Sequence, residues 1–340
     1  MNCVFFYFIC HIGFVCSYQL HNEKMYQTIK KLKTKGILAM DESIPTIGKR
    51  FSQYNILNNK KNRNKYRNIV LLQTPDLNKY VSGCILCEET ALQKSVIKNL
   101  HNNKILAGVK LDEGLIEFNK HEFLTMGLEN VKKKCKKFAD LGITFAKWRC
   151  VFHISKSQHL PSNNCIQINC NTLANFASIC QKENIVPIIE PEIVMEGNHT
   201  IYDTAKVQEI ILRNLFFALS KNDILLETII LKTNMVLPGK EASHVSYPTQ
   251  IANLTTQTFE RSVPSAVPII ALLSGGIEEN MASLYLKHIR RKIKKAKWYI
   301  TFSFGRALQH SCLKTWNNNK KNTYKAQKEL LSKLIENTHY

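Results

Sequence analysis

From residue 35 onward the chain repeats one pattern eight times: a short apolar stretch rich in β-branched residues, then a longer amphipathic or polar segment. Each apolar stretch ends in charged or glycine-rich residues. Neighbouring stretches begin 23 to 47 residues apart, which leaves room for a helix between them. The stretches are Gly36–Asp41, Gly83–Glu89, Leu106–Asp112, Ile143–Arg149, Val186–Ile193, Thr228–Val236, Ile269–Gly276 and Tyr299–Arg306. Eight β/α units in sequence predict a closed (β/α)8 barrel, a TIM barrel of the α/β class, formed by a single domain.

Helices are predicted in the longer segments between these stretches, where apolar residues follow a helical period. The predicted helices are Gly127–Leu141, Asn171–Glu183, Thr200–Ser220, Glu278–Ala296 and Lys325–Glu336.

The composition agrees with a folded chain and narrows the choice of partners. The chain has 340 residues, 44% apolar and 21% charged, which places it outside the disordered and coiled-coil classes. Its 47 basic and 26 acidic side chains give a net charge of +21, so an anionic partner is expected: nucleic acid, an acidic membrane surface or a phosphorylated small molecule. Much of the lysine lies in Lys/Asn runs such as residues 58–65 and 317–322, which are typical of solvated loops. No specific nucleic-acid partner is therefore predicted.

The 11 cysteines are an odd number without the spacing of a secreted disulfide scaffold, which favours reduced thiols. Cys84 and Cys87 form a Cys-x-x-Cys pair, but they lie in an apolar run with no second Cys or His pair near them in the sequence. We interpret this pair as core packing. The histidines are scattered singly, so neither a metal site nor a cofactor is predicted.

The first twenty residues are set apart by their composition. Residues 3–17 are almost wholly apolar and uncharged, shorter than the about 20 residues that span a bilayer but suited to the core of a signal peptide. No basic residue precedes this run, and Met25 would serve equally well as a start. We therefore divide the chain into a leader at 1–20, with or without a targeting role, and a barrel domain at 21–340. No stable membrane span is predicted in the mature chain, and both cytoplasm and plastid stay open as compartments.

Ionisable residues gather at the carboxyl ends of the predicted strands. Three strands carry them in i, i+2 pairs, which places both members of a pair on one face of the strand. These pairs are Lys110 with Asp112, Lys147 with Arg149, and Glu190 with Glu192. A purely structural role would be unfavourable, because an unpaired buried charge costs several kcal/mol. Since barrel active sites lie at the carboxyl ends of the strands, we interpret the group as a functional cluster.

Lys232 lies near the end of an apolar strand, in the run IILKTNM. A strand-end lysine that is desolvated beside other cations can lose its proton, add to a ketone and form a Schiff base. The protonated imine then accepts electrons when a carbon–carbon bond breaks, which is aldolase chemistry. Glu190, Glu192 and Asp41 are candidates for the acid and base steps. A lone lysine at a sheet end more often extends its amine to solvent, so this prediction depends on the whole cluster.

Two regions of the sequence suit the binding of phosphate. Ser274–Gly276 offers small residues with exposed backbone N–H groups after the seventh strand, and Arg306 follows Ser303 after the eighth. Barrel phosphate sites commonly form from these two loops. Lys49 and Arg50, shortly after the first strand, provide a second cationic pair. Two anion sites beside a Schiff-base lysine indicate a bisphosphorylated sugar.

Together these motifs resemble the class I fructose-1,6-bisphosphate aldolase family, in a single register from about residue 25 to 336. The resemblance is carried by GILAMDES (36–43), GKRF (48–51), GVKLDEGL (108–115), FAKWRC (145–150), ANFASICQKENIVPIIEPEI (174–193), LKTNMVLPGK (231–240), VPSAV (263–267), LLSGG (272–276) and TFSFGRALQHSCLKTW (301–316). The first and last of these look more like plastid and plant-type members than animal ones. The resemblance implies a homotetramer without metal or cofactor. It also implies reversible cleavage of fructose 1,6-bisphosphate to dihydroxyacetone phosphate and glyceraldehyde 3-phosphate, in glycolysis, gluconeogenesis or the Calvin cycle.

The resemblance also implies individual roles. Lys232 would be the Schiff-base lysine, Glu190 the acid and base for dehydration of the carbinolamine, and Asp41 the group that handles the C4 hydroxyl proton. The residues that balance charge around the reacting carbons would be Lys147, Glu192 and Arg149. One phosphate would be bound by Ser274, Gly275, Gly276, Ser303 and Arg306. The other would lie near Ser43, Lys49 and Arg50, with Lys110 lining the pocket.

The chain departs from the family pattern at several positions. Thr233 stands where the family normally carries Pro, which frees the backbone beside Lys232 and adds an N–H, so this lysine is expected to be held less rigidly. Pro45 stands where a more flexible residue is usual, and Glu113 replaces a customary lysine and lowers the local positive potential. Tyr340 follows the last helical pattern by only a few residues, so a short tail is expected to slow protonation of the enamine.

Two other interpretations are open at this point. The first is an aldolase-like binding or scaffold protein with reduced or no turnover, which would suit the departures and the excess positive charge. The second is a transaldolase-like Schiff-base barrel, which is disfavoured because two phosphate regions are superfluous for a monophosphate substrate. Trapping of a covalent adduct and the preference between mono- and bisphosphate ketoses separate the three.

Overall fold

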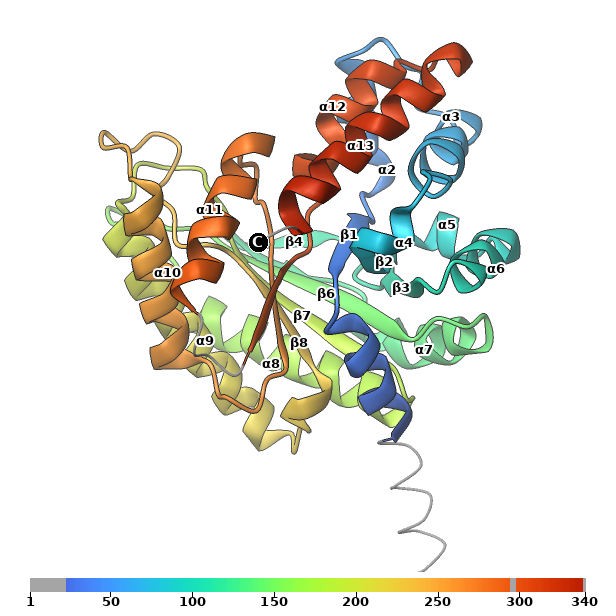
Figure 1. Ribbon diagram of the computed structural model, residues 1–340. Helices are drawn as coiled ribbons and strands as arrows, with labels where there is room; N and C mark the ends of the chain where they lie inside the picture. The colour runs from blue at the N-terminus through green and yellow to red at the C-terminus, as the bar shows by residue number, and fades with distance from the viewer. Residues whose placement is uncertain (1–22, 294–297, 339–340) are drawn as a thin grey trace, which may run out of the picture.

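The computed structural model describes residues 23–293 and 298–338 and contains the predicted barrel (Figure 1). Eight parallel strands lie in the order β1-β2-β3-β6-β7-β8-β9-β10. They are β1 Gly36–Met40, β2 Val81–Leu86, β3 Leu106–Lys110, β6 Phe145–Phe152, β7 Val186–Ile193, β8 Ile230–Thr233, β9 Ile269–Leu272 and β10 Tyr299–Phe302. Each strand falls within or overlaps one of the eight apolar stretches, which confirms the predicted fold class.

The first and last strands approach each other closely enough to complete the barrel. Ala39 N donates to Phe304 O at 3.0 Å, and the Thr301 hydroxyl donates to Lys35 O at 3.2 Å. Gly36 faces the ring of Phe302, and a Cβ atom added to Gly36 would lie 1.8 Å from the ring Cζ atom. A residue with a side chain would collide at this point, so glycine is required where β1 passes β10.

Helices surround the strands (Figure 1). They are α2 Ile44–Ser52, α3 Lys60–Asn64, α4 Leu77–Tyr80, α5 Glu88–Ala91, α6 Lys94–Asn102, α7 Val131–Asp140, α8 Asn163–Lys182, α9 Ile201–Lys221, α10 Pro248–Ser262, α11 Glu279–Lys292, α12 Arg306–Trp316 and α13 Thr323–Thr338. Short 3-10 turns lie at Leu128–Asn130, Leu226–Thr228 and Lys320–Asn322. All five predicted helices are present. Helix α8 begins earlier than predicted because Ser162 caps it, its hydroxyl accepting from Cys165 N at 3.2 Å.

The barrel interior is apolar at one end and ionised at the other, on the same strands. Side chains that face the interior recur every second residue. On β7, Val186 and Ile188 belong to the buried apolar cluster, and Glu190 lines the cavity two residues later. On β8, Ile230 and Lys232 are related in the same way. Residues on one face of each strand are therefore apolar in the core and ionisable where the strand reaches the cavity.

A helix over residues 23–32, dark blue in Figure 1, closes the apolar end of the barrel. Its Met25, Ile29 and Leu32 pack in the same buried cluster as the strand residues of that end. The Ser82 hydroxyl donates to Leu32 O at 3.2 Å and so ties the helix to β2. The described chain thus begins at the barrel end opposite the cavity.

Several elements were not predicted from the sequence. A hairpin of β4 Leu115–Asn119 and β5 Glu122–Thr125 is inserted after β3, and β4 is exposed along its whole length. Helix α3 and the π-helix η1, Lys65–Leu71, occupy part of the Lys/Asn run at 58–65 that was interpreted as a solvated loop. That interpretation is wrong for Arg63, which is buried and donates to both oxygens of Glu89 at 2.7 and 2.8 Å.

The described cysteines are free thiols. Cys84 is buried in β2, where burial raises its pKa, and Cys87 contacts the Thr90 hydroxyl at 3.3 Å.

Within residues 23–293 and 298–338, no group of His, Cys, Asp or Glu is placed to hold a metal ion. None of the helices in these two ranges has the length and apolar character needed to cross a membrane. The leader predicted at 1–20 and Tyr340 lie outside the described residues.

Candidate active site

One cavity of about 990 Å³ lies at the carboxyl ends of the barrel strands, and every residue proposed from the sequence for catalysis or binding lines it. The catalytic candidates are Asp41, Lys147, Arg149, Glu190, Glu192 and Lys232. The binding candidates are Ser43, Lys49, Arg50, Lys110, Ser274, Gly275, Gly276, Ser303 and Arg306. Residues far apart in the sequence therefore meet in one place, as the strand-end pattern predicts.

A chain of ion pairs crosses the floor of the cavity. Lys232 Nζ lies 2.9 Å from Glu190 Oε1, and Lys147 Nζ lies 2.9 Å from Glu190 Oε2. Lys147 Nζ also lies 2.7 Å from Asp41 Oδ2. The side chains of Lys232, Glu190 and Lys147 are each buried to within 5% exposure. Because β6, β7 and β8 supply one member each and Asp41 directly follows β1, closure of the barrel brings the four residues together.

The ion pairs on the cavity floor stabilise the charged form of each of their members. Burial alone would raise the pKa of Asp41, but Lys147 and Lys232 hold that pKa well below its ordinary value. Burial likewise opposes ionisation of Glu190, and the same two lysines keep its pKa below the ordinary value. Burial would lower the pKa of Lys147, whereas Asp41 and Glu190 raise it. At neutral pH, Glu190 therefore presents ionised oxygens to both lysines.

Two further ion pairs complete the floor. Arg149 Nε contacts Glu192 Oε2. Burial opposes the charge of Arg149, but the neighbouring glutamates raise its pKa above the ordinary value. Lys110 Nζ lies 2.6 Å from Asp112 Oδ1. Each cation of the floor thus has a carboxylate within contact distance.

A candidate anion site lies on the side of the cavity formed by β9 and β10. Gly275 and Gly276 adopt φ angles of +45° and +96°, a left-handed turn that suits glycine and is typical of backbone N–H anion sites. The buried Ser303 hydroxyl oxygen has no hydrogen-bond partner among the described residues. Arg306 begins α12 and donates to Gly276 O. An unpartnered hydroxyl beside a guanidinium and a turn of N–H groups suits a phosphate.

A second candidate anion site lies along α2. The Ser43 hydroxyl caps this helix, accepting from Thr46 N at 3.4 Å and contacting Thr46 Oγ1 at 2.9 Å. Pro45 lies in the first turn, where a helix has no internal partner for an N–H, so this proline starts the helix without loss of a hydrogen bond. Lys49 and Arg50 follow in the last turn of the helix and line the cavity.

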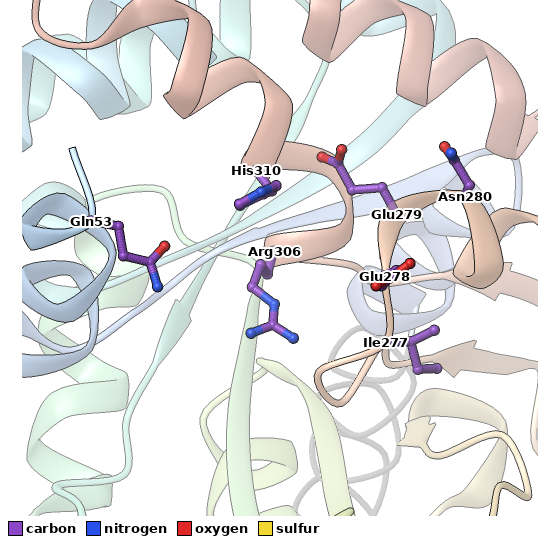
Figure 2. Close-up of a pocket in the computed structure, with 7 residues that line it drawn as sticks. All are labelled: Gln53, Ile277, Glu278, Glu279, Asn280, Arg306 and His310. Carbon is purple, nitrogen blue, oxygen red and sulfur yellow. The ribbon is translucent and has the colours of Figure 1, made fainter. Parts of the chain in front are cut away.

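A smaller hollow of about 320 Å³ adjoins the first anion site. Figure 2 shows Arg306 and His310 on α12 between Gln53, at the end of α2, and Glu278 and Glu279, at the start of α11. Arg306 lines both hollows, so its guanidinium is reached from two sides.

Sequence reasoning missed several supporting residues. Glu42 follows Asp41 in the chain, lines the cavity and forms an ion pair with Arg50. Arg67 is 1% exposed and donates to Glu42 O at 2.7 Å. Gln309 donates to Ala39 O at 2.6 Å. The motif GILAMDES could have pointed to Glu42, but no local pattern marked Arg67 in its polar run.

Glu113, expected to lower the positive potential of the site, does not line the cavity. Its carboxylate lies 2.7 Å from Lys134 Nζ and accepts from Asn130 Nδ2 at 3.0 Å. The hydrogen bonds with Lys134 and Asn130 lower the pKa of Glu113. Its charge is therefore compensated on the outer surface of the barrel.

The fold and the site define a class: a (β/α)8 barrel of the aldolase type, with a buried lysine–glutamate contact between two candidate anion sites. A sequence model described as "Glycolytic: Fructose-bisphosphate aldolase class-I" matches residues 24–339. The chain therefore belongs to the class I fructose-bisphosphate aldolase family.

Individual relatives agree with this assignment. The chain is 41% identical over 311 residues to the cytosolic fructose-bisphosphate aldolase 4 of Arabidopsis thaliana, a match that covers 89% of this chain and 78% of the relative. It is 41% identical over 325 residues to the fructose-bisphosphate aldolase 2 of Plasmodium berghei (strain Anka), with 93% and 88% covered. Similarity to plant members is thus confirmed, and the Plasmodium relative is equally similar.

A solved structure is also similar. It is the fructose-bisphosphate aldolase of Plasmodium falciparum in complex with TRAP and a small-molecule inhibitor. It matches with a TM-score of 0.91 at 40% identity and covers 93% of both chains. The single-domain barrel is therefore shared with this relative over nearly its whole length.

Proposed function

We propose that this chain catalyses the reversible cleavage of fructose 1,6-bisphosphate to dihydroxyacetone phosphate and glyceraldehyde 3-phosphate, with Lys232 as the Schiff-base nucleophile. The observation that carries the proposal is the 2.9 Å contact between Lys232 Nζ and Glu190 Oε1, in a cavity with an anion site on each side. Relatives named fructose-bisphosphate aldolase, 40–41% identical over most of the chain, support both substrate and reaction.

The covalent step begins with transfer of a proton from Lys232 to Glu190. The amine nitrogen then attacks the C2 carbonyl carbon of the open-chain sugar, and a proton passes from that nitrogen to the carbonyl oxygen to give a carbinolamine. Glu190 returns its proton to the C2 hydroxyl, which leaves as water, and a protonated imine remains. Glu190 can serve both halves of this exchange because it faces Lys232 and stays fixed by Lys147.

Cleavage follows at the C3–C4 bond. Asp41 accepts the proton of the C4 hydroxyl, C4 becomes the aldehyde carbon of glyceraldehyde 3-phosphate, and the bonding electrons pass to the imine nitrogen to give an enamine. Lys147, 2.7 Å from Asp41, keeps a positive charge beside that carboxylate, and Arg149 and Glu192 balance charge nearby. Protonation of the enamine at C3 and hydrolysis of the imine release dihydroxyacetone phosphate and free Lys232.

The two anion sites place the substrate across this chemistry. One phosphate is bound by Ser274, Gly275, Gly276, Ser303 and Arg306, and the other by Ser43, Lys49 and Arg50, with Lys110 lining the pocket between floor and rim. A phosphate held at each side positions the reacting carbons over Lys232, so binding energy is converted into orientation.

Borohydride trapping tests the covalent step. Reduction of a mixture of protein and dihydroxyacetone phosphate should leave a stable adduct, and peptide mass mapping should locate it on Lys232. A Lys232→Met variant should give none. A folded wild-type protein that binds the phosphate ester but forms no adduct would overturn the proposal and leave a binding or scaffold role. Faster turnover of a monophosphate ketose than of the bisphosphate would contradict the proposed substrate.

We also propose that the protein is a homotetramer, as the family resemblance implies. Light scattering on the purified protein should give a mass four times that of the 39.1 kDa chain. A mass equal to that of one chain would overturn this assignment.

The compartment is proposed to depend on residues 1–20. Two similar plant proteins are named cytosolic aldolases. A fluorescent fusion of the full chain is expected to leave the cytoplasm if the leader is a targeting segment, whereas a fusion that lacks residues 1–20 should stay there. Identical distributions of the two fusions would assign no targeting role to the leader.

A further inference from the structure

The main-chain pairing between β7 and β8 ends just before these strands deliver their functional side chains. The last paired residues are Ile189 and Leu231, and no later pair joins the two strands in the described part of the chain. Glu190 and Lys232 come next, and Pro191 has no N–H with which to continue a ladder. At the level of the reacting groups, side chains must therefore hold the two strands together.

Asn234 makes one such connection, since its side chain accepts from Ile193 N at 2.7 Å and donates to Ile193 O at 2.8 Å. Thr233 makes the connection nearest to Glu190 and Lys232. Its hydroxyl donates to Pro191 O at 3.3 Å, directly after Glu190 in the chain. Its main-chain oxygen accepts from Leu273 N at 2.9 Å, on the side of β9. Thr233 thus ties the residue after Lys232 to both neighbouring strands.

Gln208, on α9, fixes the direction of that hydroxyl. Its side-chain Nε2 donates to Thr233 Oγ1 at 3.1 Å and to Asn234 O at 3.0 Å. Since the hydroxyl accepts from Gln208, its single proton is directed to Pro191. Thr233 and Gln208 are only 1% and 2% exposed, so bulk water cannot replace either partner. Gln208 Oε1 has no partner among the described residues, and the side chain acts as a donor alone.

We propose that Thr233 and Gln208 form a positioning unit that holds Lys232 in register with Glu190. This inference rests on the proposed Schiff-base function and deepens it. Without proline after Lys232, the chain fixes the backbone by three buried side-chain hydrogen bonds, in place of the looser arrangement expected from the sequence. Neither residue touches the substrate; both act through Lys232, whose Nζ must stay within reach of Glu190 for the proton transfers.

Three substitutions test the unit. Thr233→Val removes the hydroxyl at nearly constant volume, Gln208→Met removes the donor, and Thr233→Ser keeps the hydroxyl. We expect the first two to lower kcat, and the single-turnover rate of borohydride trapping with dihydroxyacetone phosphate, by about tenfold to a hundredfold, because misplacement of a reacting group by about 1 Å has an effect of that order. The KM for fructose 1,6-bisphosphate should change by less than about twofold, since the anion sites are untouched.

Three comparisons distinguish positioning from simple loss of stability. Thr233→Ser should restore both rates to within about twofold of wild type. The double variant Thr233→Val/Gln208→Met should be no slower than Thr233→Val alone, because residues that act as a unit are not additive. Thr74→Val is the matched control: its hydroxyl donates to Val70 O at 2.8 Å, it is also buried, and it lies outside the cavity. This control should lose stability while keeping its trapping rate.

The outcomes separate the two proposals. If wild type forms no adduct, the proposed function fails. If wild type forms the adduct and folded Gln208→Met and Thr233→Val trap at the wild-type rate, the function stands and the positioning unit is refuted. Should Thr233→Val fail to fold, Gln208→Met decides alone, because it leaves Thr233 and the strand intact. A slowed Thr233→Ser variant would also count against the proposal.

Discussion

Replacing Lys147 with Met tests the charge balance of the cavity floor most directly. Lys147 Nζ lies between Asp41 Oδ2, at 2.7 Å, and Glu190 Oε2, at 2.9 Å, with its side chain 4% exposed. Methionine keeps most of the stem but removes the cation that contacts both Asp41 and Glu190, so that Lys232 alone of the two lysines is left to balance both carboxylates. Removing one partner of a buried ion pair costs about 3–5 kcal/mol, so we expect the free energy of unfolding to fall by that amount at pH 7, with loss of cleavage.

The pH dependence of this loss distinguishes charge from packing. In wild type the pKa of Asp41 is depressed, so its contribution to stability is present above its unfolded-state value of about 3.9 and is lost as pH falls through the folded-state pKa. Without Lys147, burial and the second carboxylate oppose ionisation while Lys232 alone of the two lysines favours it, and we expect the two carboxylates to share one proton that the unfolded chain would release. The folded variant then binds more protons than the unfolded chain, so its stability should rise from pH 8 to pH 5, by up to about 1.4 kcal/mol per pH unit for one proton.

Urea unfolding at pH 5, 6, 7 and 8 measures both effects. Lys79→Met is the control, because Lys79 pairs with Asp76 at 3.1 Å on the surface, with side chains 64% and 54% exposed. This control should change the free energy of unfolding by less than about 1 kcal/mol at every pH. A Lys147→Met variant that loses less than about 1 kcal/mol, or whose loss does not depend on pH, would refute the argument from uncompensated buried charge.

Three further predictions concern binding and stability. Arg306→Met should raise the KM for fructose 1,6-bisphosphate about tenfold to a hundredfold in steady-state assays, because a hydrogen bond to a charged group contributes about 1.5–3 kcal/mol. Gly36→Ala should lower the free energy of unfolding in urea by about 1–3 kcal/mol, since its Cβ would meet the Phe302 ring. Thr200→Ala should lower it by about 1 kcal/mol, because it breaks the capping box with Asp203; an unchanged urea midpoint would contradict this.

The barrel was predictable because its strands are short, apolar and regularly separated by helices. Buried parallel strands read as continuous apolar runs, and β1 and β9 show this directly. The hairpin was not predictable by the same means, because β4 is wholly exposed and so carries no alternation between buried and exposed residues. Hydrophobic patterns in the sequence indicate which elements have a buried face, and they do not predict an element that lacks one.

The members of the candidate site were predictable from their positions at strand ends, but their pairing was not. The sequence offers Glu190 and Glu192 as equivalent carboxylates on one face of β7. In the structure, Glu190 contacts Lys232, whereas Glu192 contacts Arg149. This difference depends on the stagger of neighbouring strands around the barrel, which arises only when the sheet closes. Gln208 was equally hidden, since its role depends on the packing of α9 against β8.

The helix over residues 23–32 places the start of the described chain at the barrel end opposite the cavity. It closes the apolar end of the barrel, while substrate would enter at the opposite end. A tag or fluorescent protein joined ahead of residue 23 would be attached on the side away from the cavity mouth. Changes at this point therefore need not alter access to the cavity, so the sequence ahead of the barrel and the residues of the cavity can vary independently.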